Sequence, residues 1–236
     1  MKKISQEDLT NILIKHNEWL SGSLSGVKAD LSKLDLSELN LSYGNLKEVN
    51  LSMSNLKRAN LCHANLMRVN LIQSDLTEAR LSCACLIGAD LTESCLINGI
   101  LYKADLSGVN LSGVILRKSD LSEANLINSN LSGANLIEAN LSWANLTGAN
   151  LNGAYLNGAY VYKTTLPKQY KIINSVFPIL ADKIDKTIKI GCRCYSVKKW
   201  EKFGLDIADT ESLTNEQIEI LKDDIEMLKI WMNRKD

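Results

Sequence analysis

Histidine, proline and phenylalanine are scarce in this sequence, which has two of each among 236 residues. A hydrolase needs a nucleophile beside a base, and histidine serves as the base more often than any other side chain. Only His16 and His63 could fill that role. No phosphate-binding loop of the G-x-x-x-x-G-K or G-x-G-x-x-G type occurs either. The composition therefore gives little support to an enzyme.

Neither sign of charge dominates, because 27 Lys and Arg stand against 27 Asp and Glu. A surface that binds nucleic acid usually needs an excess of basic residues. Residues 183 to 202 are locally basic and include Tyr195 and Trp200, a mixture that can contact phosphates and stack on bases. Residues 206 to 226 are as strongly acidic, so the two segments neutralise each other. We therefore expect no nucleic acid partner.

Long apolar runs are also absent. The first twenty residues, MKKISQEDLTNILIKHNEWL, have charges scattered among the apolar side chains and lack the continuous apolar core of a signal peptide. No other run is long enough to span a bilayer. The six cysteines show no disulfide framework, as is usual for reduced proteins. We expect a cytoplasmic protein with no membrane partner.

What the sequence has in abundance is a repeat of five residues. From Leu31 to Leu166 a large aliphatic residue returns at every fifth position, 28 times in all, and only Val161 is not leucine. The residue two positions before it is small or of modest size except at Leu34 and Leu39, and Asn or Asp usually stands between the two. Each unit thus reads A-(D/N)-L-x-x. This period fits neither an α-helix nor a β-strand and marks an internal repeat.

A chain that turns a corner every five residues places the leucine and the small residue inside and the other three residues outside. Four corners close a square coil, and successive coils stack at about 4.8 Å with backbone hydrogen bonds along the stack. The repeat predicts about seven such coils, a rod about 34 Å long. We expect an enlarged inside residue, as in Ala139→Leu, to be costly, and an outside change, as in Asn140→Ser, to cost little.

The run ANLSWANLTGANLNGAYL at residues 139–156 resembles the pentapeptide-repeat family. The resemblance covers about residues 24–166 and implies an all-β solenoid, namely a right-handed quadrilateral β-helix. It implies little about activity, because the family is diverse. Some members are dimers joined near their C-termini that mimic duplex DNA and act on type II topoisomerases such as DNA gyrase. That mimicry needs an acidic rod, whereas residues 24–166 hold 12 acidic and 11 basic residues.

The N-terminal segment, residues 1–23, is predicted to be a capping helix. Ser5 stands three residues before Asp8, as in a capping box, and Leu9, Ile12 and Leu13 share one face. Such a helix would lie over the first coil. An uncovered β edge would otherwise invite pairing with another chain.

The C-terminal segment, residues 167–236, is predicted to be an α-containing tail. Pro167 ends the repeat, and the short apolar runs as far as about residue 191 could form a final partial coil or a strand that covers the open end. Ser196 is a candidate N-cap for a short helix that ends at Gly204. Thr214 and Gln217 read as a capping box for a helix over about 214–234.

This last helix carries a narrow apolar stripe, whose members are Ile218, Leu221, Ile225, Leu228 and Met232. Their steps of three and four residues are typical of a helix that packs against a partner helix. Two heptads are too short to be stable alone, so the stripe must dock on its own rod or on another copy. We favour a homodimer through the C-terminal segment, since two-fold dimers are the commonest oligomers.

A second candidate surface lies on one side of the predicted rod. Residues twenty apart stack on the same side, and one side gathers Cys95, Ile97, Ile115, Ile137 and Tyr155. Contiguous apolar surface usually marks a contact with another molecule. The alternative is that isoleucine is tolerated there for its strand propensity alone.

We find no candidate catalytic, metal-binding or cofactor-binding residue. The pairs Cys83-x-Cys85 and Cys192-x-Cys194 lack the two-residue spacer and the histidine partners of zinc sites. Cys62 and His63 are adjacent, but their side chains would point in different directions on a coil, so they would not form a nucleophile and base pair. The sequence therefore favours a non-catalytic scaffold that binds an unknown protein. A DNA-mimicking modulator of DNA gyrase is the alternative, disfavoured by the nearly neutral rod.

Overall fold

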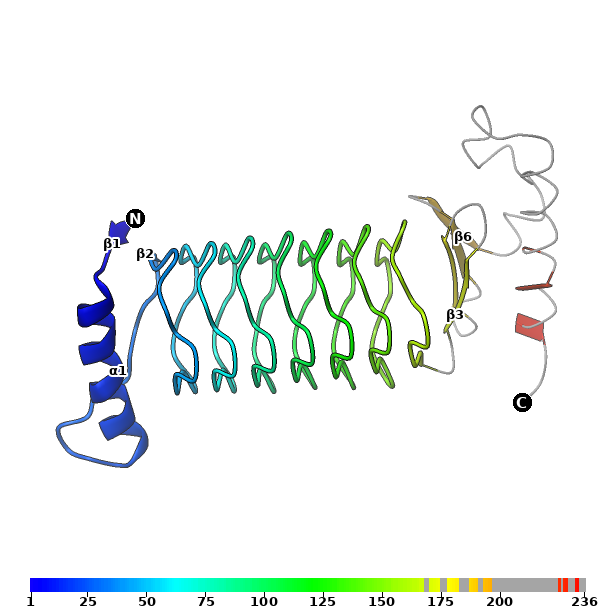
Figure 1. Cartoon of the computed structure of the whole chain (residues 1–236). Coiled ribbons are helices and arrows are strands. Elements are labelled where there is room, and N and C mark those ends of the chain that lie inside the picture. Colours follow the sequence, from blue (N-terminus) through cyan, green and yellow to red (C-terminus); the bar gives the residue numbers. More distant parts are fainter. Residues whose placement is uncertain are drawn as a thin grey trace.

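The structure is a computed structural model that describes residues 1–167, 170–174, 178–182, 187–190 and 193–196, together with residues 225, 227, 228, 232 and 233. The elements in this part of the chain are β1 (Lys2–Lys3), α1 (Gln6–Leu20), β2 (Leu34–Asp35), β3 (Tyr170–Asn174), β4 (Pro178–Asp182), β5 (Thr187–Ile190) and β6 (Arg193–Ser196). Figure 1 shows a rod of stacked coils with α1 at one end and β3–β6 at the other. Among the described residues, no helix is long and apolar enough to cross a membrane.

The rod is a β-solenoid, as the repeat predicted. The residue before each repeat leucine forms a parallel bridge with the residue twenty positions later, from Asp30 with Asn50 to Asn145 with Thr165. One coil therefore takes four units of five residues. The leucine N–H donates to a carbonyl of the next coil, as Leu91 N does to Asn110 O at 2.8 Å. Backbone hydrogen bonds thus run along the rod on all four sides.

The interior of the rod is a column of leucines. Every repeat leucine from Leu31 to Leu156 is at most 5% exposed, and the small residues two positions earlier are buried beside them. Leu34 and Leu39, the two large residues at this small position, are only partly buried and pack against the core in the first coil. They fit there because α1, rather than another coil, covers them.

Each corner is a β-turn. The N–H of Ala59 donates to Leu56 O at 3.0 Å across one such turn, and the residue between them, Arg58, has a φ of 58°. This left-handed conformation recurs at the second residue after almost every repeat leucine. Glycine adopts it without strain, so Gly133 and its equivalents occupy corners as the repeat predicts.

The Asn and Asp residues before the leucines form hydrogen-bonded ladders along the rod. The Oδ1 atom of Asn140 accepts the N–H of Ser142 at 3.1 Å, and its Nδ2 donates to Asp120 Oδ1 at 3.2 Å, one coil away. Asn140 therefore does more than face water. These bonds revise the expected cost of Asn140→Ser upward, since serine is too short to make both of them.

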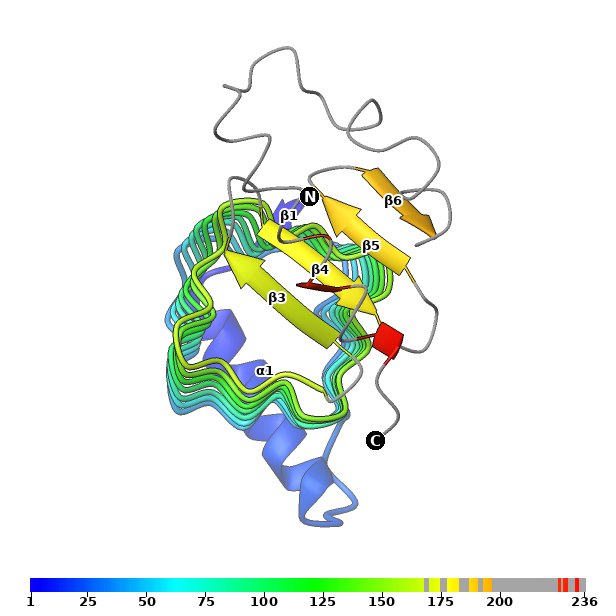
Figure 2. The same ribbon diagram turned by 90° about the vertical axis from the view of Figure 1, so that its right-hand side faces the viewer.

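At the N-terminal end α1 lies across the first coil, as Figure 2 shows in a view along the rod. Its N-cap is Ser5, whose side chain accepts the N–H of Asp8 while the Asp8 carboxylate accepts the N–H of Ser5. Leu9 is fully buried, and Ile12 and Leu13 pack partly buried against the same core. The helix thus extends the core of the rod beyond its first coil.

The N-terminal segment also pairs with backbone groups at the open edge of the first coil. On one side β1 adds to β2 as a parallel strand, with Lys2 opposite Leu34. On the next side the Gln6 side chain takes the place of a strand, because its Nε2 donates to Asn40 O at 3.0 Å and its Oε1 accepts the N–H of Asn40 at 2.9 Å. These contacts leave no open edge at either position.

His16 makes the third set of edge contacts. Its ring is fully buried, with Nε2 2.9 Å from Lys47 O and Nδ1 accepting the N–H of Ala29 at 3.2 Å. Because Nδ1 accepts, the imidazole is neutral and carries its proton on Nε2, which donates to Lys47 O. Burial is the main cause of a pKa for His16 below its ordinary value. The histidine is therefore a structural residue of the cap.

At the other end of the rod the chain forms a four-stranded antiparallel sheet in the order β3-β4-β5-β6. The sequence led us to expect a partial coil or a single covering strand, and the four strands correct that expectation. The short apolar runs are rich in isoleucine, which suits strands even where no clear period is visible. Ser196 is the last residue of β6. The short helix predicted after it lies outside the described residues.

Candidate functional site

The structure brings the five residues of the second candidate surface to one side of the rod, which we call the isoleucine face. Its members are Cys95, Ile97, Ile115, Ile137 and Tyr155. Cys95 forms a bridge with Ile115, one coil along, so their side chains are neighbours on that side. Ile115 is 37% exposed and Tyr155 is 36% exposed, and the other three are half-buried.

Two polar residues interrupt the isoleucine face. Asn135 bridges to both Ile115 and Tyr155 and so lies between them, and Arg117 holds the position midway between Ile97 and Ile137. The face is therefore a mixed stripe of aliphatic, guanidinium and amide groups. Protein interfaces have this composition more often than a purely apolar one, and arginine is enriched in them.

The described part of the C-terminal stripe is buried within a single chain. Ile225, Leu228 and Met232 are 8%, 0% and 1% exposed. Ile218 and Leu221 lie outside the described residues. The three described members of the stripe are therefore not accessible surface in one copy of the protein.

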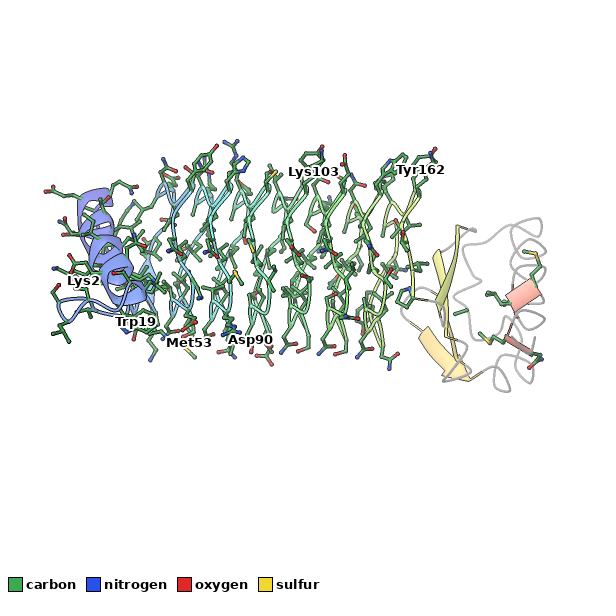
Figure 3. The ribbon with its side chains drawn as sticks, turned by 90° about the horizontal axis from the view of Figure 1, so that it is seen from below. Lys2, Trp19, Met53, Asp90, Lys103 and Tyr162 are labelled. Carbon is green, nitrogen blue, oxygen red and sulfur yellow. The ribbon has the colours of Figure 1, made fainter. Side chains whose placement is uncertain are left out.

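A cluster of exposed aromatic residues lies at the C-terminal end of another side of the rod. Trp143, Tyr160 and Tyr162 are 55%, 67% and 63% exposed. Lys163 Nζ lies 4.2 Å from the centroid of the Trp143 ring, and Trp143 meets Tyr162 edge to face at 5.9 Å. Figure 3 shows Tyr162 at the last coil. The spacing of twenty residues between Trp143 and Lys163 could have revealed this contact in the sequence.

Charges of both signs alternate along the corners. Arg58 lies between Glu38 and Glu78, at 3.5 Å and 3.9 Å, and Lys103 pairs with Glu123 at 3.3 Å. The side chains in these pairs are at least 44% exposed, so each pair contributes little to stability. The pairs do prevent these corners from presenting a continuous acidic stripe.

The residues that could support chemistry are dispersed. His63 stacks on Tyr43 with ring centroids 4.9 Å apart, and Cys62 and Cys83 are free thiols. Within the described ranges, no group of three or more His, Cys, Asp and Glu side chains could hold a metal ion.

Comparison with known proteins identifies the repeat. The family model described as pentapeptide repeats matches the chain in 8 copies, over residues 54–93, 104–142 and 134–166. The pentapeptide repeat protein Rfr23 from the cyanobacterium Cyanothece 51142 is 30% identical, and the match covers 67% of this chain and 99% of Rfr23 with a TM-score of 0.33. The chain belongs to the pentapeptide-repeat family.

Two further solved structures of pentapeptide-repeat proteins are similar to this chain. HetL from the cyanobacterium Nostoc sp. strain PCC 7120, a protein involved in regulating heterocyst differentiation, is 28% identical over 64% of this chain and 90% of its own, with a TM-score of 0.29. QnrB1, a plasmid-mediated fluoroquinolone resistance protein, is 17% identical over 60% of this chain and 83% of its own, also with a TM-score of 0.29. No protein of curated function matches the chain. These similarities assign no specific role to this chain.

Proposed function

We propose that this pentapeptide-repeat protein is a non-catalytic cytoplasmic scaffold that binds another protein through its isoleucine face. The observation that supports this proposal is the alignment of Cys95, Ile97, Ile115, Ile137 and Tyr155 on one side of a rod whose outward residues are mostly polar. Mixed stripes of aliphatic and polar groups that include arginine are typical of contact surfaces, and solenoid proteins commonly bind along an extended side.

The rigidity of the rod favours such a role. Each coil is held to the next by backbone hydrogen bonds of 2.7–3.0 Å along this side, for example from Leu96 N to Ile115 O and from Lys118 N to Ile137 O. The side chains therefore stand at fixed spacings before a partner arrives. Binding to a preformed surface loses less conformational entropy than binding to a mobile one.

The proposal is tested with two matched double variants in pull-downs from the native host. Ile97→Asp with Ile137→Asp places charges on the isoleucine face, and Ile87→Asp with Ile127→Asp places them at the equivalent repeat positions on the opposite side. A partner should be captured by the wild type and the control variant and lost from the first variant. Equal capture by all three proteins would exclude the isoleucine face as the contact surface.

We also retain the proposal of a homodimer through the C-terminal segment. Because Ile225, Leu228 and Met232 are already buried in one chain, a dimer would have to use Ile218 and Leu221 or exchange the last helix between copies. Light scattering of the wild type and of Leu221→Asp with Leu228→Asp tests this. The mass should halve in the variant, and a wild type that is monomeric at tens of micromolar would refute the dimer.

No observation specifically favours the alternative, a DNA mimic that modulates DNA gyrase. The 12 acidic and 11 basic residues of the repeat region leave it almost neutral, and several corner charges pair with opposite charges one coil away. A gyrase supercoiling assay with and without the protein should show no difference.

A further inference from the structure

Two residues of the first coil, Asp30 and the half-buried Asn45, have no backbone hydrogen-bond partner among the described residues. The sides of Asp35 and Asn40 are covered by β1 and the Gln6 amide, and on the Asn45 side His16 contacts Lys47 O. On the remaining side, the N–H and C=O of Asp30 have no hydrogen-bond partner among the described residues, and Asp30 is exposed. In every later coil the corresponding groups bond to the coil before, as Asn50 N does to Ala29 O.

The Asp30 edge forms one wall of a groove of about 560 Å³ between α1 and the segment that enters the rod. Its lining consists of Asn11, Ile12 and Lys15 from α1 and Val27, Lys28, Ala29 and Asp30 from that segment. The apolar side chains in it are Ile12, which is half-buried, Val27, which is 60% exposed, and the buried Ala29. The groove thus combines an open strand edge with an apolar surface.

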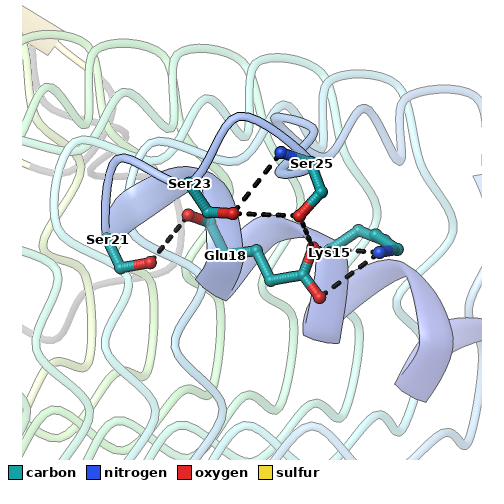
Figure 4. A network of polar contacts seen from close by, with 5 residues as sticks. All are labelled: Lys15, Glu18, Ser21, Ser23 and Ser25. Atoms are coloured by element: carbon teal, nitrogen blue, oxygen red, sulfur yellow. Dashed lines mark hydrogen bonds and ion pairs between the residues drawn. The ribbon is translucent and has the colours of Figure 1, made fainter.

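The walls of the groove are fixed by a polar network at the C-terminal end of α1, shown in Figure 4. Lys15 Nζ donates to Glu18 Oε2 at 2.9 Å, and Ser25 Oγ donates to the same oxygen at 3.0 Å. The Val27 N–H donates to Lys15 O at 3.0 Å, which ties the segment that enters the rod to the helix. The groove is therefore formed before any ligand enters it.

We propose that this groove binds an extended peptide segment of another protein, which adds to the Asp30 edge as a parallel strand. The rod itself supplies the template, because β1 already adds a parallel strand to the neighbouring side of the same coil. We call the peptide residue opposite Asp30 the paired residue. By the pattern of the later coils, the Asp30 N–H would donate to the carbonyl of the peptide residue that precedes the paired residue. The Asp30 C=O would accept the N–H of the peptide residue that follows it. Strand addition of this kind is a recurrent mode of peptide recognition.

The side chains of the groove indicate which peptides it accepts. The peptide residue before the paired position would face Ala29 and Ile12, which favours an apolar side chain. The paired residue would stand beside the Asp30 carboxylate, whose Oδ1 already accepts the Ser32 N–H and Asn50 Nδ2 at 3.0 Å. Hydrogen bonds from Ser32 hold the pKa of Asp30 below its ordinary value, so the carboxylate stays ionised and can only accept. The groove should prefer asparagine to aspartate at the paired position.

The test uses the full-length protein and two blocked, fluorescently labelled peptides. The first carries the chain's own repeat sequence SGANLIE, residues 132–138, and the second carries SGADLIE. Peptide affinity is measured by fluorescence anisotropy, and the site is identified from amide chemical shifts and hydrogen exchange. Saturable binding of the first peptide should slow exchange of the Asp30 amide. The first peptide should bind about tenfold more tightly than the second.

The variant Asp30→Asn should remove most of that preference, because its amide can donate to a peptide aspartate. Asp90→Asn, on the same side of the rod but inside the ladder, should leave the preference unchanged and serves as the matched control. Equal affinities for the two peptides, or shifts that exclude Asp30, would overturn the proposal. So would an Asp30 amide already protected in a protein whose mass is twice that of one chain, since a second copy would then fill the groove.

The proposal shares with the scaffold function only the assumption of a protein partner. The groove contains no residue of the isoleucine face. A negative peptide result would leave the isoleucine pull-down unaffected, and a negative pull-down would leave the peptide measurements unaffected.

Discussion

Replacing Ser94 with alanine should stabilise the protein, although serine is buried at the same position in neighbouring coils. Ser54, Ser74 and Ser94 occupy one inside column, spaced by twenty residues. The hydroxyl of Ser54 donates to Leu51 O at 2.7 Å, and that of Ser74 to Leu71 O at 2.6 Å. The Ser94 hydroxyl is buried and has no partner.

The two substitutions should therefore change the free energy of unfolding in opposite directions. Ser94→Ala removes a desolvated and unpaired hydroxyl and should raise it by about 1 kcal/mol. Ser74→Ala removes a hydrogen bond but leaves Leu71 O paired with the Ser74 N–H at 3.1 Å, so it should lower the free energy of unfolding by about 1 kcal/mol. Alanine is the usual residue at this position, and neither change introduces strain.

Urea denaturation followed by circular dichroism measures both variants against the wild type. A difference of about 2 kcal/mol between them should separate the two denaturation midpoints clearly. If Ser94→Ala destabilises the protein as much as Ser74→Ala does, the Ser94 hydroxyl has a partner and the reasoning fails.

Three further predictions concern the cap and the core. Burial lowers the pKa of His16 in the folded protein, whereas the histidine pKa in the unfolded chain is about 6.5. The stability should therefore be constant above about pH 6.5 and fall as the pH drops below that value. His16→Gln should reduce this pH dependence of the stability in melting curves. Gln6→Leu removes both contacts with the Asn40 backbone and should accelerate exchange of the Asn40 amide about tenfold, measured by NMR. Ala139→Leu should cost about 1–3 kcal/mol by overpacking, and Asn140→Ser about 1 kcal/mol through its lost ladder bond, both measured in urea. Equal stability of Ala139→Leu and the wild type would contradict the inside position of Ala139.

The coil could be predicted from the sequence because its contacts are local in the repeat. A leucine at every fifth position determines which residues lie inside, and the period of twenty determines which residues stack. The isoleucine face followed from the same arithmetic, which would also have revealed the contact of Trp143 with Lys163. The ladder bonds of Asn140 were missed because an outward position was equated with an unpaired side chain.

The ends of the rod were harder to predict. Gln6 resembles any exposed polar residue in the sequence, and its partner Asn40 lies 34 positions away, so its role depends on the placement of α1. The runs that form β3–β6 have no clear period, and neither their number of strands nor their pairing follows from their composition. The backbone groups at the open ends of the rod form hydrogen bonds with residues far away in the sequence. Such contacts leave no local pattern in the sequence.

In the four-sided coil, the number of repeat units between two surfaces determines both their distance along the rod and the angle between them. Because a coil takes twenty residues, inserting one whole coil between the Asp30 groove and the isoleucine face would move them apart by about 4.8 Å and leave their relative direction unchanged. Inserting a single five-residue unit would instead rotate one surface relative to the other by a quarter turn. The number of units between two binding surfaces therefore sets the angle between them in discrete steps, so that repeat number alone can determine whether two bound partners face the same way.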